Sequence, residues 1–191
     1  MWSEIAITAA IIAALLGLTI ASAPAGAQQV LSPYRDQQFT KIRGLTDAEV
    51  GELKSGTGMG LARAAELNGY PGPRHVLDAI AAGHLPVTPE QNRRVVQIFE
   101  EMTGKARSLG EQIIAEERAL EMAFRAGAID NTDLRTRATR IALLRGELRA
   151  VHLGAHLETR ALLSAAQIAR YNEFRGYKAE SGQPDNSHQR H

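Results

Sequence analysis

Residues 88–126 have the sequence TPEQNRRVVQIFEEMTGKARSLGEQIIAEERALEMAFRA. No proline follows Pro89 in this stretch, and its apolar residues recur at alternating intervals of four and three, a spacing that lines one face of an α-helix. They are Val95, Phe99, Met102, Ala106, Leu109, Ile113, Leu120 and Ala123. Glu116 lies on the same face and interrupts it. The stretch therefore predicts one continuous helix, roughly 60 Å long at the usual rise per residue.

A second long helix is predicted directly after the first. Gly127 fits the residue that ends a helix, and Asp130 or Asn131 fits the N-cap of the next one. From about residue 132 to residue 162 the apolar face consists of Leu134, Ile141, Leu144, Leu148, Val151, Ala155 and Leu162. Because only about four residues link the two helices, they must run antiparallel, and we predict an αα-hairpin.

Three helix starts share one signature, in which a Thr or Ser N-cap is followed three residues later by Glu or Gln. The cap hydroxyl accepts a hydrogen bond from the third residue's backbone amide, and that residue's side chain accepts one from the cap amide. The three stretches are Leu45-Thr46-Asp47-Ala48-Glu49, Val87-Thr88-Pro89-Glu90-Gln91 and Leu163-Ser164-Ala165-Ala166-Gln167. They predict helices that begin next to residues 46, 88 and 164.

Shorter helices are expected beside the hairpin, at about residues 46–54, 59–68 and 73–82, with a closing helix at residues 164–175. A two-helix hairpin buries too little apolar surface to offset the conformational entropy that its chain loses on folding. The short helices and a second copy of the chain can supply more surface. We therefore predict an all-α fold, a long antiparallel helical hairpin with short flanking helices, assembled as a homodimer.

The first 27 residues predict export from the cytoplasm. They contain an almost wholly apolar segment, residues 5–23, and Ala25 and Ala27 supply the small residues that a signal peptidase accepts. Glu4 is their only charged residue, and the apolar segment is long enough that an uncleaved inner-membrane anchor is the alternative. Both alternatives place the helical domain, residues 28–177, in the periplasm. The polar residues 178–191 are expected to form a disordered tail.

The composition argues against several functions. The 191 residues include no cysteine, which excludes thiol nucleophiles, disulfides and thiolate metal sites. The 22 basic and 21 acidic residues nearly balance, which argues against nucleic-acid binding. No nucleophile elbow or zincin motif is present, so we predict no enzyme activity. The glycine-rich residues 56–60 lack the pattern of a phosphate-binding loop and are interpreted as a turn between two short helices.

The stretches at 87–91 and 163–167, flanking a long helical hairpin behind an export signal, resemble the paired motifs of the LTxxQ-motif proteins of the bacterial periplasm. That family includes the Spy/CpxP-like chaperones and periplasmic heavy-metal sensor and resistance proteins. The resemblance covers about residues 86–177, and Val87 and Ser164 each replace one residue of the motif, a Leu and a Thr. Residues 61–77 also look like a segment of uncharacterised relatives of the group.

The resemblance implies an ATP-independent chaperone or stress-response protein, a curved helical dimer that holds unfolded clients or other envelope proteins on its concave face. Such a surface needs apolar patches rimmed by charge, because apolar area binds without sequence demands and charges speed the encounter. Cations along the hairpin fit this rim, and each also fits an ordinary solvated helix face. They are Arg93, Arg94, Lys105, Arg107, Arg135, Arg137, Arg140, Arg145 and Arg149.

His152 and His156 are the candidate metal ligands. They lie four residues apart on the second long helix, so their imidazoles project from the same side about one turn apart. Two histidines do not complete a tetrahedral site, and two surface histidines beside a packed seam are the alternative interpretation. A partner subunit or one of four further residues would complete the site: Glu147, Glu158, His75 or His84. The pair predicts, as an alternative function, binding or sensing of zinc, copper or nickel, with an inner-membrane sensor as partner.

Overall fold

The computed structural model describes residues 31–177, so the predicted export signal at residues 1–27 and the predicted tail at 178–191 lie outside the described residues. The chain divides into two compact units, and the fold described below is that of residues 37–177, within the unit that begins at Gln37. Across residues 31–177 the secondary structure is helical and no strand occurs, which confirms the all-α class for this part of the chain. No helix in this range combines the length and apolar character that crossing a membrane requires.

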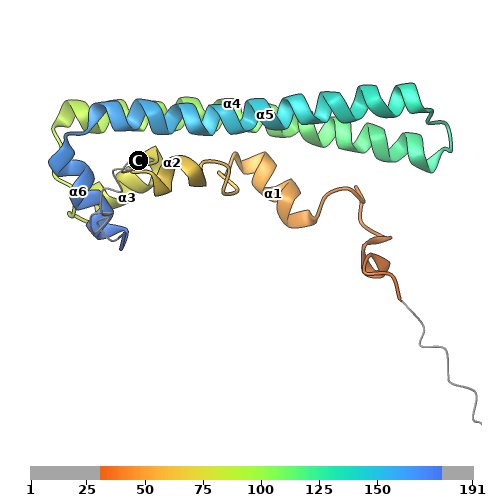
Figure 1. The fold of residues 1–191 in the computed structure, drawn as a ribbon, viewed down its shortest axis with the longest axis horizontal. Coiled ribbons are helices and arrows are strands. Elements are labelled where there is room, and N and C mark those ends of the chain that lie inside the picture. The colour runs from red at the N-terminus through yellow and green to blue at the C-terminus, as the bar shows by residue number, and fades with distance from the viewer. Residues whose placement is uncertain (1–30, 178–191) are drawn as a thin grey trace, which may run out of the picture. The chain divides into compact units, whose positions relative to one another are not determined.

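The two predicted long helices are present and pack side by side (Figure 1). They are α4 (Pro89–Arg125, 37 residues) and α5 (Asn131–Leu162, 32 residues), with residues 126–130 between them. Arg94 of α4 donates to Glu158 of α5 at 3.2 Å, whereas Glu117, further along α4, accepts from Arg145, which comes earlier in α5, at 3.0 Å. The two helices therefore run in opposite directions where they pack.

Three short helices lie along one side of this pair, and α6 lies at its end (Figure 1). They are α1 (Asp47–Ser55), α2 (Arg63–Leu67) and α3 (Pro73–Ala81), while α6 spans Ala165–Phe174. The prediction of a helix from about residue 59 is wrong at its start, since α2 begins at Arg63. Met59 and Gly60 have φ angles of 48° and 71°, a left-handed conformation that cannot continue a right-handed helix.

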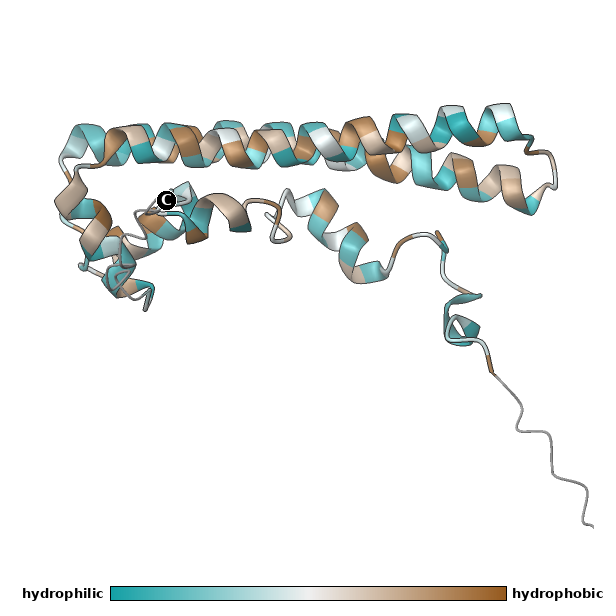
Figure 2. Ribbon diagram, viewed as in Figure 1, coloured by the Kyte–Doolittle hydropathy of each residue, from teal (hydrophilic) through white to brown (hydrophobic). Residues whose placement is uncertain are grey.

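Apolar and polar residues alternate along both long helices (Figure 2). Apolar residues of the pair contribute to two buried clusters. The first joins α1 to the middle of the pair and consists of Ile42, Leu45, Leu53, Ala106, Ile113, Ile114, Leu144 and Leu148. The second joins α3 and α6 to its end and consists of Val76, Ala79, Leu85, Val95, Leu163, Ile168 and Tyr171. Burying a Leu or Ile side chain contributes roughly 1.5–3 kcal/mol. The short helices thus supply apolar contacts to the pair, and the homodimer stays a prediction.

All three predicted capping boxes are present, at Thr46, Thr88 and Ser164. The glutamines of the second and third also bind each other's segment, a contact that the sequence did not predict. Gln91 Nε2 donates to the Leu162 carbonyl at 2.7 Å and to Gln167 Oε1 at 3.1 Å. Gln167 Nε2 donates in return to the Pro86 carbonyl at 2.9 Å. This glutamine clasp ties the start of α4 to the α5–α6 junction.

Replacing Gln91 with alanine is expected to lower the free energy of unfolding by about 2 kcal/mol, because one cap and the bond to the α5–α6 junction are lost together. Gln167→Ala should cost a similar amount, and the double variant should lose less than the sum because the two side chains share a bond. Urea denaturation measures this cycle, with Gln97→Ala on the exposed face of α4 as control. Additive losses would show two independent caps.

Candidate functional site

The two candidate histidines line a cavity of about 610 Å³, called here the histidine cavity. Four segments surround it: α5, the middle of α4, the first turn of α3, and the turn that follows α1. The last of these is the glycine-rich segment at residues 56–60, which was predicted only to form a turn. The fold therefore brings this turn and Gly72, at the start of α3, against one side of α5, which comes much later in the sequence.

His152 is buried inside this arrangement. The residue is only 3% exposed, and its Nε2 atom has no hydrogen-bond partner among the described residues. Burial, reinforced by the nearby His156, lowers the pKa of His152, so the neutral imidazole is favoured in the folded protein. A polar atom left without a partner in this way is costly unless water or a ligand satisfies it.

His156 is held in one orientation by the turn before α3. Its Nδ1 atom lies 2.7 Å from the carbonyl oxygen of Tyr70, so the neutral ring donates from Nδ1 and keeps its lone pair on Nε2. A Cβ at Gly72 would lie 2.8 Å from that Nε2 atom. Only glycine therefore lets the turn approach the ring this closely. His156 lines the cavity, and no hydrogen bond to its Nε2 atom occurs within residues 31–177.

The alternative interpretation of these histidines as surface residues is wrong, because His152 is 3% exposed and the His156 side chain is 12% exposed. The structure places one of the four suggested companions, His75, on the same cavity. Glu158 pairs with Arg94, and His84 packs on Phe174 with ring centroids 4.9 Å apart. Glu147 lines a separate hollow on the helix pair. Within residues 31–177, no three His, Asp or Glu side chains are grouped to hold a metal ion.

Glu66 was not predicted as a site residue, yet its side chain is 11% exposed and joins three helices. It accepts hydrogen bonds from the hydroxyls of Tyr171 and Tyr177 and from the Gly72 amide, and it pairs with Arg175 at 3.4 Å. Burial and the Glu66 carboxylate raise the pKa of Tyr171, which keeps its hydroxyl protonated as a donor. The carboxylate also lies 3.8 Å from His156 Nδ1. This network fixes α6 and the Gly72 turn against α5.

Acid is expected to destabilise the fold through His152. Because its folded-state pKa is lowered, the unfolded chain binds the proton more readily, so stability present above the ordinary histidine pKa of about 6.5 is lost as pH falls below it. Between pH 7.5 and pH 5, His152→Leu should lose less stability than the unmodified chain, by on the order of 1 kcal/mol. Urea denaturation at the two pH values measures this, and His84→Gln, at an exposed histidine, should behave like the unmodified chain.

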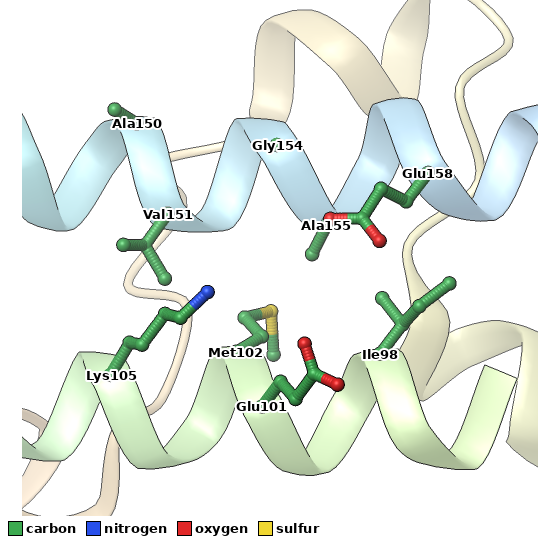
Figure 3. A pocket seen from close by; sticks show the side chains of 9 residues that line it. All are labelled: Ile98, Glu101, Met102, Lys105, Ala150, Val151, Gly154, Ala155 and Glu158. Carbon is green, nitrogen blue, oxygen red and sulfur yellow. The ribbon is translucent and has the colours of Figure 1, made fainter. Parts of the chain in front are cut away.

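A second hollow lies between the two long helices, on a face to which only α4 and α5 contribute lining residues. Figure 3 shows Ile98, Met102 and Lys105 rising from α4 toward Val151 and Ala155 of α5. This hollow has a volume of about 290 Å³, and three charged residues also line it: Glu101, Lys105 and Glu158. An adjoining hollow of about 460 Å³ continues along the pair, lined by Leu109 and Ala150 among others. Together they form an apolar depression rimmed by charge, called here the helix-pair groove.

Comparison of the chain with protein-family models, with curated proteins and with solved structures gave no match.

Proposed function

We propose that this chain is a periplasmic, ATP-independent chaperone or stress protein of the Spy/CpxP type, which holds partly unfolded proteins reversibly. The observation that carries the proposal is the helix-pair groove. Its floor is apolar, with Ile98, Met102 and Val151, and its rim carries both signs of charge, with Lys105 and Glu101. A surface of this kind binds exposed apolar segments of many sequences, because apolar contact makes no demand on sequence and the charged rim speeds encounter.

The position of the groove supports the same proposal. The short helices α1 and α3 contact α4 in the fold, yet every residue that lines the groove belongs to α4 or α5. The groove is therefore open to a client along the pair. Export by the predicted N-terminal signal would place it where unfolded envelope proteins occur and where a chaperone must act without ATP.

The proposal includes a homodimer. Near the turn that links the long helices, Met122 and Phe124 are 61% and 57% exposed, so this end of the pair presents apolar side chains that a second copy would cover. Sedimentation or light scattering at micromolar concentration tests the dimer. A well-folded monomer in that concentration range would contradict the homodimer. Clients would then be held by the groove of a single chain.

The test of holding is suppression of client aggregation without ATP. Chemically denatured citrate synthase, diluted into buffer, should aggregate less when the exported chain is present in near-stoichiometric amounts. Val151→Asp places a charge on the groove floor and should reduce protection several-fold. Leu157→Asp is the matched control, since Leu157 is an exposed leucine of α5 that does not line the groove. Equal protection by all three proteins would refute the groove as the client surface.

Metal binding is the second proposed function, favoured by the free Nε2 atom of His156 and the unpartnered Nε2 atom of His152. A His ligand whose other ring nitrogen donates to a backbone carbonyl is typical of metal sites. Titration with zinc, copper or nickel should then show micromolar binding that the double variant His152→Ala, His156→Ala abolishes. Unchanged affinity in the double variant would dispose of this function, and metal-dependent oligomerisation would favour it over holding.

A further inference from the structure

The charged residues that line the histidine cavity are all basic. Two arginines, Arg74 and Arg107, line it together with His75, His152 and His156, and none of its lining residues is an aspartate or glutamate. Arg107 donates through Nε to the Ser55 carbonyl at 3.1 Å, which holds the guanidinium at the cavity. The wall between the basic groups is apolar and includes Phe99 and Met102. A cavity with this lining favours an anion that carries an apolar body.

The first turn of α3 adds to this preference. Gly72 and Pro73 begin the helix at the cavity, and the N-cap makes no side-chain hydrogen bond because Gly72 has no side chain. The backbone amides of the first turn, at Arg74 and His75, therefore have no side-chain cap to satisfy them. Uncapped amides at the start of a helix attract negative charge, through hydrogen bonds and through the helix dipole.

A third observation concerns His152. His152 lines the cavity while 3% exposed, and its Nε2 atom has no partner in the described part of the chain. Polar atoms buried this deeply normally have a partner. We propose that the histidine cavity binds a small organic anion, with a carboxylate or phosphate head toward the basic groups and the start of α3, and an apolar body against Phe99 and Met102.

Two carboxylates lie close to the cavity without lining it. Asp78 accepts from Arg74 at 3.1 Å and lies 3.6 Å from His75 Nδ1, and Glu66 lies 3.8 Å from His156 Nδ1. Glu66 lines a smaller cavity of about 250 Å³, which shares His75 and His156 with the first. Asp78 offsets part of the charge of Arg74, whereas no carboxylate pairs with Arg107 among the ion pairs of residues 31–177. The balance at the lining still favours an anion over a metal cation.

This site is separate from the helix-pair groove and does not depend on the chaperone proposal.

The test is calorimetric titration of the full chain with octanoate, octyl phosphate, inorganic phosphate and 1-octanol. At pH 6 at least one of the first two should bind at least about tenfold more tightly than 1-octanol, which has the same apolar body and no charge, and more tightly than inorganic phosphate. The comparison of octanoate with octyl phosphate identifies the preferred head group.

The variants Arg107→Gln and Arg74→Gln should each weaken binding of the preferred anion several-fold and leave 1-octanol unchanged. Arg94→Gln is the matched control, since Arg94 lies on α4 but not on this cavity. Val151→Asp, in the groove, should bind the anion like the unmodified chain. Equal binding of 1-octanol and the anions would overturn the proposal. Loss of anion binding in a Val151→Asp variant that keeps the fold would also overturn it. Zinc binding with no anion binding would overturn it in favour of the metal site.

Discussion

Replacing Gly110 with alanine is expected to lower the free energy of unfolding by about 3 kcal/mol or more, the largest effect that a single methyl group should have in this chain. A Cβ at this position of α4 would lie 2.1 Å from the carbonyl oxygen of Leu53 and 2.7 Å from its carbonyl carbon. Because both atoms belong to the backbone of α1, no side-chain rotation relieves the overlap. The end of α1 would have to move away from α4, and the first buried cluster would open with it.

The same helix offers the control. A Cβ at Gly104 meets no atom within 4 Å, and the residue is exposed in the interior of α4. Gly104→Ala should therefore stabilise the protein by about 0.5–1 kcal/mol, since alanine is the better helix former. Denaturant midpoints of the two variants should move in opposite directions. A Gly110→Ala variant as stable as the parent would mean that α1 does not pack on α4 as described.

Removing the Glu66 carboxylate should be nearly as costly. Glu66→Ala is expected to lower the free energy of unfolding by about 3 kcal/mol, because the tyrosine hydroxyls, the Gly72 amide and the Arg175 guanidinium all lose their partner at once. The loss should also loosen the end of α6, since Tyr171 and Arg175 lose the carboxylate that ties them to α2. Urea denaturation gives the energy, and limited proteolysis within residues 165–177 reports the release of α6.

Two further variants identify the cause. Tyr171→Phe removes one hydroxyl and keeps the buried ring, so it should cost about 1 kcal/mol, a fraction of the full loss. Glu173→Ala removes an exposed carboxylate from α6 and should change stability by less than about 0.5 kcal/mol. If Glu66→Ala proved as mild as Glu173→Ala, the buried network would contribute little to the fold.

Much of the fold could be predicted from local sequence. The spacing of apolar residues predicted both long helices, and the capping boxes at Thr46, Thr88 and Ser164 marked where three helices begin. These signals are local, because the helical period and the cap geometry depend on residues at most four positions apart. The start of α2 was missed, since the left-handed conformation of Met59 and Gly60 is set by the turn rather than by apolar spacing.

The site could be predicted only in part. The spacing of His152 and His156 placed them on one side of α5, but their burial depends on the two glycine-rich turns that pack over them, at residues 56–60 and 68–73. Those contacts join residues more than 80 positions apart, and no periodicity in the sequence records them. Glu66 was missed for the same reason, because its donors come from the other end of the chain. An acidic residue beside a Gly-Tyr-Pro-Gly turn was the one local signal available.

The glutamine clasp holds one end of the long helix pair, whereas the part toward the linking turn is joined by ion pairs at half-exposed arginines, such as Arg140 with Glu116. Between residues 115 and 140 no residue is fully buried, and the linking turn follows the exposed side chains of Met122 and Phe124. Backbone amides near residues 119–138 should therefore exchange with deuterated solvent fastest, and protection should grow along both helices toward Gln91 and Gln167. Local unfolding of the hairpin should therefore start at the linking turn and reach the two glutamine side chains last.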